Sequence, residues 1–456
     1  MAAPEVTGPE ITGPEATLAG TVDPAGQRTS LTGLFLPGGR RIGPRPLALH
    51  LATAGTTLTG AMASVPAMLG GAIPWHPDLS SRAEALATEM RGADPVALMH
   101  AVAAEASRRM QATFEGIERY QTHPYRRSLP EPPAIWSSGS ARLLDYGVFH
   151  PDTADRRQPV LFVPSLVNRG YVLDLMADSS LVRWLAEATG IRPLLMDWGS
   201  PGTAERDYDI ADYLDGPLNG ALEAAAALTP EAPGRSPDRR VPVIGYCMGG
   251  TMAVALALRR PDRVRALGLL ASPWDFHADL SPQGEAFAAA LPLWEPVLTA
   301  CGEMPVDILQ AFFAALDPNL AQKKFARFAA LDPASPQAEQ FVALEDWLND
   351  GVPLTPGVAR DCLVGWYTRN RAARGTWLVR ETRILPEHLT MPVFAAIPAK
   401  DRIVPPASAR AAVARVPHAT IIEPRAGHIG MVVGSRARDS LWAPLSRWLE
   451  TLPDRS

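Results

Sequence analysis

The stretch that decides the fold is Val241-Pro-Val-Ile-Gly-Tyr-Cys-Met-Gly-Gly250, which continues into the Ala- and Leu-rich run 251–260. An apolar run that ends in Gly245-x-Cys247-x-Gly249 before a helix is typical of a nucleophile elbow, a tight turn that lifts one side chain above a parallel sheet. Glycine is needed where the turn brings backbone segments so close that a Cβ would clash. The same pattern also fits an ordinary strand–helix turn with a buried cysteine. The rest of the chain must therefore supply a base, an acid and an oxyanion hole.

The amino-acid composition excludes several classes of protein. The 456 residues are 47% hydrophobic and 20% charged, with a formal net charge of −5. We see no basic block interleaved with aromatic residues, which argues against nucleic acid as a partner. Cys247, Cys301 and Cys362 are far apart and odd in number, so we expect neither a disulfide framework nor a metal site. This cysteine usage, with no secretory signal pattern at the N-terminus, predicts a cytoplasmic protein.

The N-terminal part differs in composition from the rest. Residues 1–45 are rich in Gly and Pro, and we expect a disordered tail there. Residues 46–134 form an apolar segment and a helical region, in which Asp94-Pro95 predicts a helix start. We expect the apolar face of that helix to pack on the main domain. Residues 46–75 carry no Asp, Glu, Lys or Arg, but Gly, Thr and Ser dilute their hydrophobicity. We therefore favour a packed or membrane-surface segment over a transmembrane helix.

The sequence pattern of residues 135–456 predicts an α/β catalytic domain. Apolar strands alternate with helices, which implies a mostly parallel, doubly wound sheet with its active-site groups at the carboxyl ends of the strands. The alternation stops over residues 277–390, a helical and aromatic-rich insertion that we expect to form a cap or lid over the pocket. Trp366 and Phe313 are the cap aromatics that we expect to face the thiol. The prediction is thus an α/β-hydrolase fold with a helical cap.

We assign the catalytic base and the acid from their positions along the chain. The order Cys247, Asp401, His428 is that of nucleophile, acid and histidine in α/β hydrolases. His428 follows the last strand between glycines, where a loop can place the ring over the elbow, and Asp401 lies just past the penultimate strand. His277 and Asp275 are the alternative base and acid, because they follow the strand after the elbow helix.

The oxyanion hole requires two backbone N–H donors. One belongs to the residue after the nucleophile, Met248, and the other to a loop after an earlier strand. The loop around Leu166, Val167 and Asn168 is placed for that role, and we choose Val167.

Several short motifs accompany this site between about residues 140 and 450. They are Val167-Asn168-Arg169-x-Tyr171 with Asp174, Asp197-Trp198-Gly199-x-Pro201, Gly245-x-Cys247-x-Gly249-Gly250-Thr251, Pro273-x-Asp275-Phe276, Asp401 with Ile403-Val404-Pro405, and Gly427-His428-Ile429-Gly430. Together they resemble the catalytic subunit of poly(3-hydroxyalkanoate) synthase, an α/β-hydrolase relative with a cysteine nucleophile. The Gly-His-Ile-Gly and Asp-Trp-Gly variants are most similar to the class III type, which works with a second, non-catalytic subunit. The long N-terminal region departs from that type.

The resemblance implies an acyltransferase that polymerises (R)-3-hydroxyacyl-CoA into polyhydroxyalkanoate and releases CoA. Cys247 would carry the acyl chain, His428 would act as the base, and Asp401 would orient the imidazole or assist deprotonation. We expect no cofactor besides the CoA thioester substrate. Expected partners are hydroxyacyl-CoA, the growing polyester chain, a second synthase subunit and a second copy in a homodimer. We expect the protein on polyhydroxyalkanoate granules, with membrane contact through residues 46–75.

Two other functions fit the same sequence. A thioesterase or polyester depolymerase would use the same Cys-His-Asp site, and only the exclusion of water separates it from a synthase. A non-catalytic granule-associated protein would use residues 46–75 as its anchor. The presence of Cys247, Asp401 and His428 together argues against this second alternative.

Overall fold

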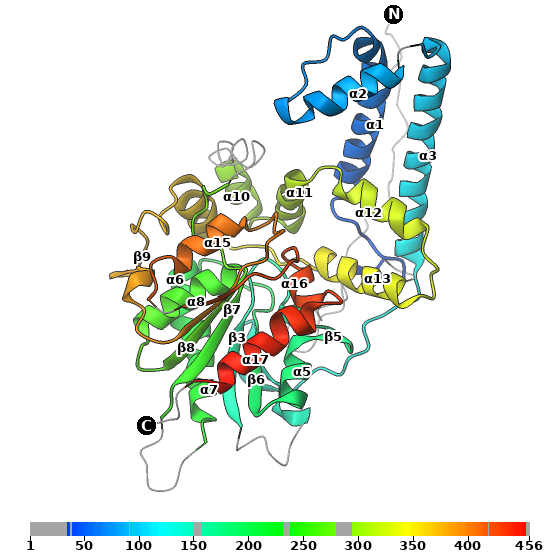
Figure 1. Ribbon diagram of the computed structural model, residues 1–456. Coiled ribbons are helices and arrows are strands. Elements are labelled where there is room, and N and C mark those ends of the chain that lie inside the picture. Colours follow the sequence, from blue (N-terminus) through cyan, green and yellow to red (C-terminus); the bar gives the residue numbers. More distant parts are fainter. Residues whose placement is uncertain are drawn as a thin grey trace, which may run out of the picture.

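A computed structural model describes residues 34–36, 39–90, 92–149, 157–230, 238–279, 294–417 and 419–452. Its centre is an eight-stranded sheet in the order β1-β2-β6-β3-β7-β8-β11-β12 (Figure 1). The strands are β1 (Ala134–Ser138), β2 (Ala141–Asp145), β3 (Gln158–Val163), β6 (Ile191–Asp197), β7 (Val241–Tyr246), β8 (Val264–Leu270), β11 (Val393–Ala396) and β12 (Thr420–Ile422).

The sheet is parallel from β6 to β12, and β1 and β2 form an antiparallel edge. This arrangement confirms the predicted α/β class. Strand β2 ends at Asp145, and a 3₁₀ turn follows it. Strand β1 was not predicted, because its mostly exposed residues give no apolar run.

Helices cover both faces of the sheet, as a doubly wound fold requires. Along β3, Leu161 and Val163 face one core cluster, whereas Val160 and Phe162 face the other. The first cluster lies under α6 (Ile210–Tyr213), α7 (Asn219–Ala227), α8 (Met248–Arg259) and α15 (Pro406–Val413). The second lies under α5 (Leu181–Ala188), α16 (Gly430–Val433) and α17 (Ala443–Glu450).

The cap is inserted between β8 and β11, as predicted. Its described part is helical apart from a short hairpin of β9 (Leu378–Val379) and β10 (Thr382–Arg383). Its helical elements are α10 (Glu295–Cys301), α11 (Val306–Leu316), α12 (Leu320–Ala329), α13 (Pro336–Asn349), α14 (Pro356–Arg360) and the π-helical segment Asp361–Thr368. Ser335 and Thr355 cap α13 and α14 by accepting backbone N–H groups, and a proline follows each of them.

Three N-terminal helices form an arm that projects from the body (Figure 1). They are α1 (Leu47–Leu69), α2 (Ser80–Met90) and α3 (Pro95–Thr122). The predicted start of α3 is confirmed, because the Asp94 side chain accepts the Val96 N–H and Pro95 is the first helical residue. The predicted packing of α3 on the main domain is confirmed, because α3 packs on α12 of the cap; it also packs on α1. Within the described residues, no helix combines the length and apolarity needed to cross a membrane.

The prediction of a disordered tail over residues 1–45 is wrong for the last part of that range. Residues 1–33 lie outside the described residues, but from Gly39 onward the chain belongs to the folded structure. Arg41 is 1% exposed, and its guanidinium donates to Asp346 Oδ1 at 2.6 Å and to the His123 carbonyl at 2.6 Å. A composition rich in Gly and Pro describes the segment as a whole, and it does not reveal that one arginine has a buried acceptor.

We predict that Asp346→Ala costs about 3–5 kcal/mol of unfolding free energy, because the buried Arg41 guanidinium loses its counter-charge. Equilibrium urea unfolding at neutral pH measures the change. As a control, Glu105→Ala removes the partner of exposed Arg108 and Arg109 on α3 and should leave the midpoint nearly unchanged. Equal midpoints for Asp346→Ala and wild type would contradict the anchoring role of this pair.

Candidate active site

Cys247 lies at the turn between β7 and α8 and has the backbone geometry of a nucleophile elbow. Its φ is 54° and its ψ is −130°, a conformation that a non-glycine residue adopts only under constraint. Two glycines let the segments approach. A Cβ on Gly249 would lie 2.0 Å from the Val163 carbonyl oxygen, and one on Gly245 would lie 2.3 Å from the Gly250 Cα. The turn therefore holds the thiol above the carboxyl ends of β3 and β7.

The structure brings His428 and Asp401 together. His428 Nδ1 lies 2.7 Å from Asp401 Oδ2, and the two residues are 8% and 5% exposed. The other carboxylate oxygen, Oδ1, accepts the backbone N–H groups of Ile403 and Val404, both at 2.9 Å. With both oxygens engaged, the carboxylate has one orientation, and it fixes the orientation of the imidazole.

His428 also interacts with Cys247. Burial acts to lower the pKa of His428, but the charge of the Cys247 side chain and the hydrogen bonds with Asp401 and Cys247 outweigh it and raise this pKa to about 10. Because Asp401 occupies Nδ1, the ring presents Nε2 to the thiol. Tyr246 supports the ring, with its centroid 5.2 Å from that of the imidazole. The hydrogen bond between the two side chains places His428 where it can accept the thiol proton, and the thiolate is the reactive form of cysteine.

The alternative acid and base lie elsewhere. Asp275 Oδ1 accepts the Asn370 side-chain N–H at 2.7 Å and the His277 backbone N–H at 2.9 Å. The Nε2 atom of His277 is 2.7 Å from the Tyr367 carbonyl oxygen, and the residue is exposed. Asp275 thus organises a loop beside the cap, and the geometry favours Asp401 and His428 over both alternatives.

The two expected oxyanion donors differ in whether their backbone N–H groups already have a hydrogen-bond acceptor. Met248 is the first residue of α8, so its N–H has no acceptor within the helix. The Val167 N–H, by contrast, donates to Ser165 Oγ at 3.2 Å. Val167 would act as a donor only if the Ser165 hydroxyl turned away, so its role stays a prediction.

Cap residues hold the loop that carries Val167. The Val352 N–H donates to the Val167 carbonyl at 2.9 Å, and Trp347 Nε1 donates to the Arg169 carbonyl at 2.7 Å. The Tyr171 hydroxyl donates to Asp350 Oδ2 at 3.2 Å. Burial raises the pKa of Asp350 to about 7, although Arg169 and Tyr171 favour the charged form. Any movement of this cap segment would therefore move the oxyanion loop.

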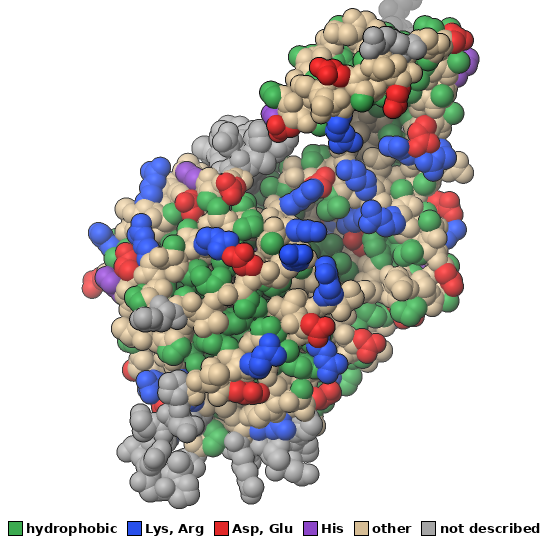
Figure 2. All heavy atoms as spheres, in the orientation of Figure 1, with side chains coloured by type: hydrophobic (Ala, Val, Ile, Leu, Met, Phe, Trp, Pro, Cys, Tyr) green, Lys and Arg blue, Asp and Glu red, His purple; other side chains and the backbone are tan. Residues whose placement is uncertain are grey.

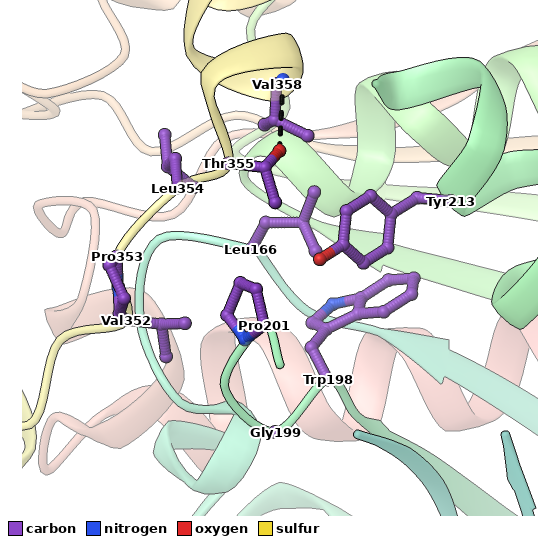
Figure 3. Close-up of a pocket in the computed structure, with 10 residues that line it drawn as sticks. All are labelled: Leu166, Trp198, Gly199, Pro201, Tyr213, Val352, Pro353, Leu354, Thr355 and Val358. Atoms are coloured by element: carbon purple, nitrogen blue, oxygen red, sulfur yellow. Dashed lines mark hydrogen bonds between the residues drawn. The ribbon is translucent and has the colours of Figure 1, made fainter. Parts of the chain in front are cut away.

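The cap and the body also pack closely beside this loop. Figure 3 shows Leu166 and Trp198 of the body facing Val352, Leu354 and Val358 of the cap. The space between them is about 10 Å³, room for no more than one water molecule. The cap and the body thus leave little space between them at this point.

The cap aromatic beside the thiol is a residue that we did not predict. Trp366 packs between Phe276 and Trp377, with centroid separations of 5.3 Å to each, and Phe313 is 36% exposed. Trp366 is thus enclosed by aromatic neighbours and Phe313 is partly exposed, and that either faces Cys247 stays a prediction. Burial raises the pKa of Tyr367, and the negative charge of the nearby Cys247 raises it further. The π-helical segment changes the helical phase at this point, so residue spacing alone could not identify Tyr367.

We predict that Cys247→Ser lowers the pKa of His428, because a neutral hydroxyl removes the negative charge that stabilises the imidazolium. NMR titration of the His428 ring proton measures the shift. Cys301→Ser, at an exposed cysteine outside the site, should leave the titration unchanged. Since the pKa of His428 is raised from 6.5 to about 10 in the folded protein, the contribution of protonated His428 to stability is fully present below pH 6.5 and is lost as pH rises through about 10. An unaltered titration in Cys247→Ser would contradict the pairing.

The chain is similar to known proteins in both sequence and fold. The family model described as the α/β hydrolase fold matches residues 234–435. Three relatives are each described as poly(3-hydroxyalkanoate) polymerase subunit PhaC. The one from Haloferax mediterranei is 30% identical over 302 residues, which cover 64% of this chain and 58% of that protein. The one from Synechocystis sp. is 29% identical, covering 64% of this chain and 77% of the relative. The one from Allochromatium vinosum is 27% identical, covering 68% and 85%.

These similarities agree with the site geometry. The match spans less than two thirds of the Haloferax relative, so it does not extend over that whole protein. The family model covers strands β7, β8, β11 and β12, the elbow, Asp401 and His428. Over residues 234–435 the chain matches the α/β hydrolase fold family, and in sequence it is similar to poly(3-hydroxyalkanoate) polymerase subunits.

Proposed function

We propose that this chain polymerises (R)-3-hydroxyacyl-CoA thioesters into polyhydroxyalkanoate, with release of CoA through a covalent acyl intermediate on Cys247. The observation that carries the proposal is the buried His428–Asp401 pair, joined at 2.7 Å, beside a cysteine held at an elbow. The relatives named above are polymerases, which makes acyl transfer to a hydroxyl the preferred reaction of this site.

Acylation begins with the proton of the Cys247 thiol on His428. The Cys247 sulfur attacks the thioester carbonyl, and the Met248 N–H with a second donor from the oxyanion loop stabilises the tetrahedral oxyanion. The bond from the carbonyl carbon to the CoA sulfur then breaks, and the imidazolium gives its proton to the departing thiolate. One thioester replaces another, so the step has little thermodynamic cost.

Elongation uses the same groups. His428 accepts the proton of the hydroxyl on the next hydroxyacyl unit, and that oxygen attacks the acyl carbonyl on Cys247. An ester bond forms, the bond to the Cys247 sulfur breaks, and the proton returns from His428 to that sulfur. Asp401 keeps Nδ1 occupied and Nε2 directed at the reacting atoms throughout.

Transfer must compete with hydrolysis. A well-oriented hydroxyl can reach an effective molarity of about 10⁵ M or more, which favours it over water if water has limited access. The buried His428, the closely packed cap–body junction and Tyr367 beside the thiol support such restricted access.

The decisive experiment is incubation of purified protein with 3-hydroxybutyryl-CoA. We expect CoA release, measured with a thiol reagent, together with polymer, measured by chromatography. Cys247→Ala should lower the rate at least about 10³-fold, because no covalent intermediate can form, and Cys301→Ala should keep wild-type activity. Free 3-hydroxybutyrate as the sole product would support the thioesterase alternative, and absence of any CoA release would support the non-catalytic one.

Assembly and location are also proposals. We infer a homodimer that acts with a second synthase subunit, since the relatives' names describe polymerase subunits. We further infer a cytoplasmic protein attached to granules through the N-terminal arm. Large apolar side chains are exposed on that arm: Trp75, Val96, Met99 and Phe114 are between 41% and 60% exposed.

We predict that Met99→Glu combined with Phe114→Glu weakens sedimentation with isolated polyhydroxyalkanoate granules, because charge opposes contact with an apolar polyester surface. The matched control is Leu378→Glu on the cap hairpin, where 55% of the residue is exposed, and it should sediment like wild type. If the double variant sediments as completely as wild type, the arm is not the anchor.

A further inference from the structure

A second hollow lies beside the loop that carries His428. It has a volume of about 530 Å³, within the usual range for small-molecule pockets of roughly 300–1,000 Å³. One wall is the loop 422–427 after β12. The other walls are Gly430, the segment 434–436 and Ser440. Gly427 and Gly430 flank His428 in the sequence, so the pocket and the candidate active site share one loop.

Two of the arginines that line this pocket have no protein partner among the described residues. Arg425 and Arg436 are exposed, and within the described residues neither guanidinium makes an ion pair or a hydrogen bond. The carboxylate of the pocket, Glu423, does have a partner: Arg410 donates to it at 2.7 Å. The pocket therefore combines a neutralised acid with two unneutralised cations.

Positive charge extends around the pocket. The Lys400 N–H donates to the Ala426 carbonyl at 2.9 Å, so another cationic residue lies next to the wall. Figure 2 shows Lys and Arg side chains gathered on this face between α16 and α12. Like charges brought close together repel each other, and an anion bound among them removes that repulsion. The charge pattern fits a ligand with several negative charges.

We propose that this pocket binds the phosphate groups of the nucleotide end of the CoA thioester. The inference rests on the proposed function for the identity of the substrate. Planar guanidinium groups match phosphate oxygens with paired hydrogen bonds, which makes arginine well suited to this task. A nucleotide end held on this side of the loop leaves the extended arm of CoA to carry the thioester toward Cys247.

The test compares two substrates that differ in phosphate. The double variant Arg425→Gln, Arg436→Gln should raise KM for 3-hydroxybutyryl-CoA by roughly tenfold, because the charge-assisted bonds to phosphate are lost. The rise should be absent for the N-acetylcysteamine thioester of the same acid, which carries no phosphate. Arg374→Gln, at an exposed arginine of the cap, is the matched control and should not change either KM. In wild type, the KM for the CoA thioester should rise with ionic strength.

Direct binding separates this proposal from the proposed function. Calorimetric titration with adenosine 3′,5′-bisphosphate should give saturable binding to wild type and at least tenfold weaker binding to the double variant. If that result holds while hydroxyacyl-CoA is not turned over, the pocket stands and the synthase assignment fails. Equal KM rises for both thioesters, an unchanged KM for the CoA thioester, or inorganic phosphate binding as tightly as the bisphosphate would each overturn the pocket assignment.

Discussion

The close contact between the first turn of α8 and the ends of β3 and β7 is the constraint on which the site depends. A Cβ on Gly249 would lie 2.0 Å from the Val163 carbonyl oxygen, so only glycine lets α8 come this close to β3. That approach forces Cys247 to a φ of 54° and places its thiol between the oxyanion loop on one side and the histidine loop on the other. A strained residue of this kind persists only where the surrounding structure over-determines it. Here, the buried strand β7 and a helix α8 that is buried from Met248 to Ala257 provide that support.

The acid and the base are held by a different mechanism. Their loops follow β11 and β12, which pair in parallel, so both loops emerge at the same edge of the sheet. Backbone hydrogen bonds join the loops, from the Ala399 N–H to Pro424 and from the Lys400 N–H to Ala426, both at 2.9 Å. This pairing brings together two side chains that are 27 residues apart in sequence and gives them a hydrogen bond of 2.7 Å.

Helix α13 connects the N-terminal region to the oxyanion loop. On one side, Asp346 accepts from Arg41, and Asn349 Oδ1 accepts the Arg45 N–H at 2.6 Å. On the other side, the segment just after the helix bridges to the oxyanion loop through Gly351 and Asn168. The N-terminal residues from Gly39 onward are thus part of the structure that positions the cap, and they are not merely an appendage. Their charge pair is buried, and removing one partner would leave the other charge without compensation.

The sequence by itself determined the sheet, the elbow and the identities of the candidate nucleophile, acid and base. These features depend on local patterns: apolar strand runs, glycines at fixed spacing around Cys247, and the order of strand ends along the chain. Only the tertiary structure decided which other groups surround the site. Tyr367 lies close enough to Cys247 for the charge of the cysteine to raise its pKa, and it belongs to a π-helical segment that changes the phase of its helix. Arg41 is buried because Asp346, 305 residues away, lies opposite it. The Val167 N–H is engaged by Ser165, two residues away, through a loop conformation that the cap maintains. Contacts between segments far apart in the chain have no signature in residue spacing, because they are set by how the cap and the arm pack on the sheet.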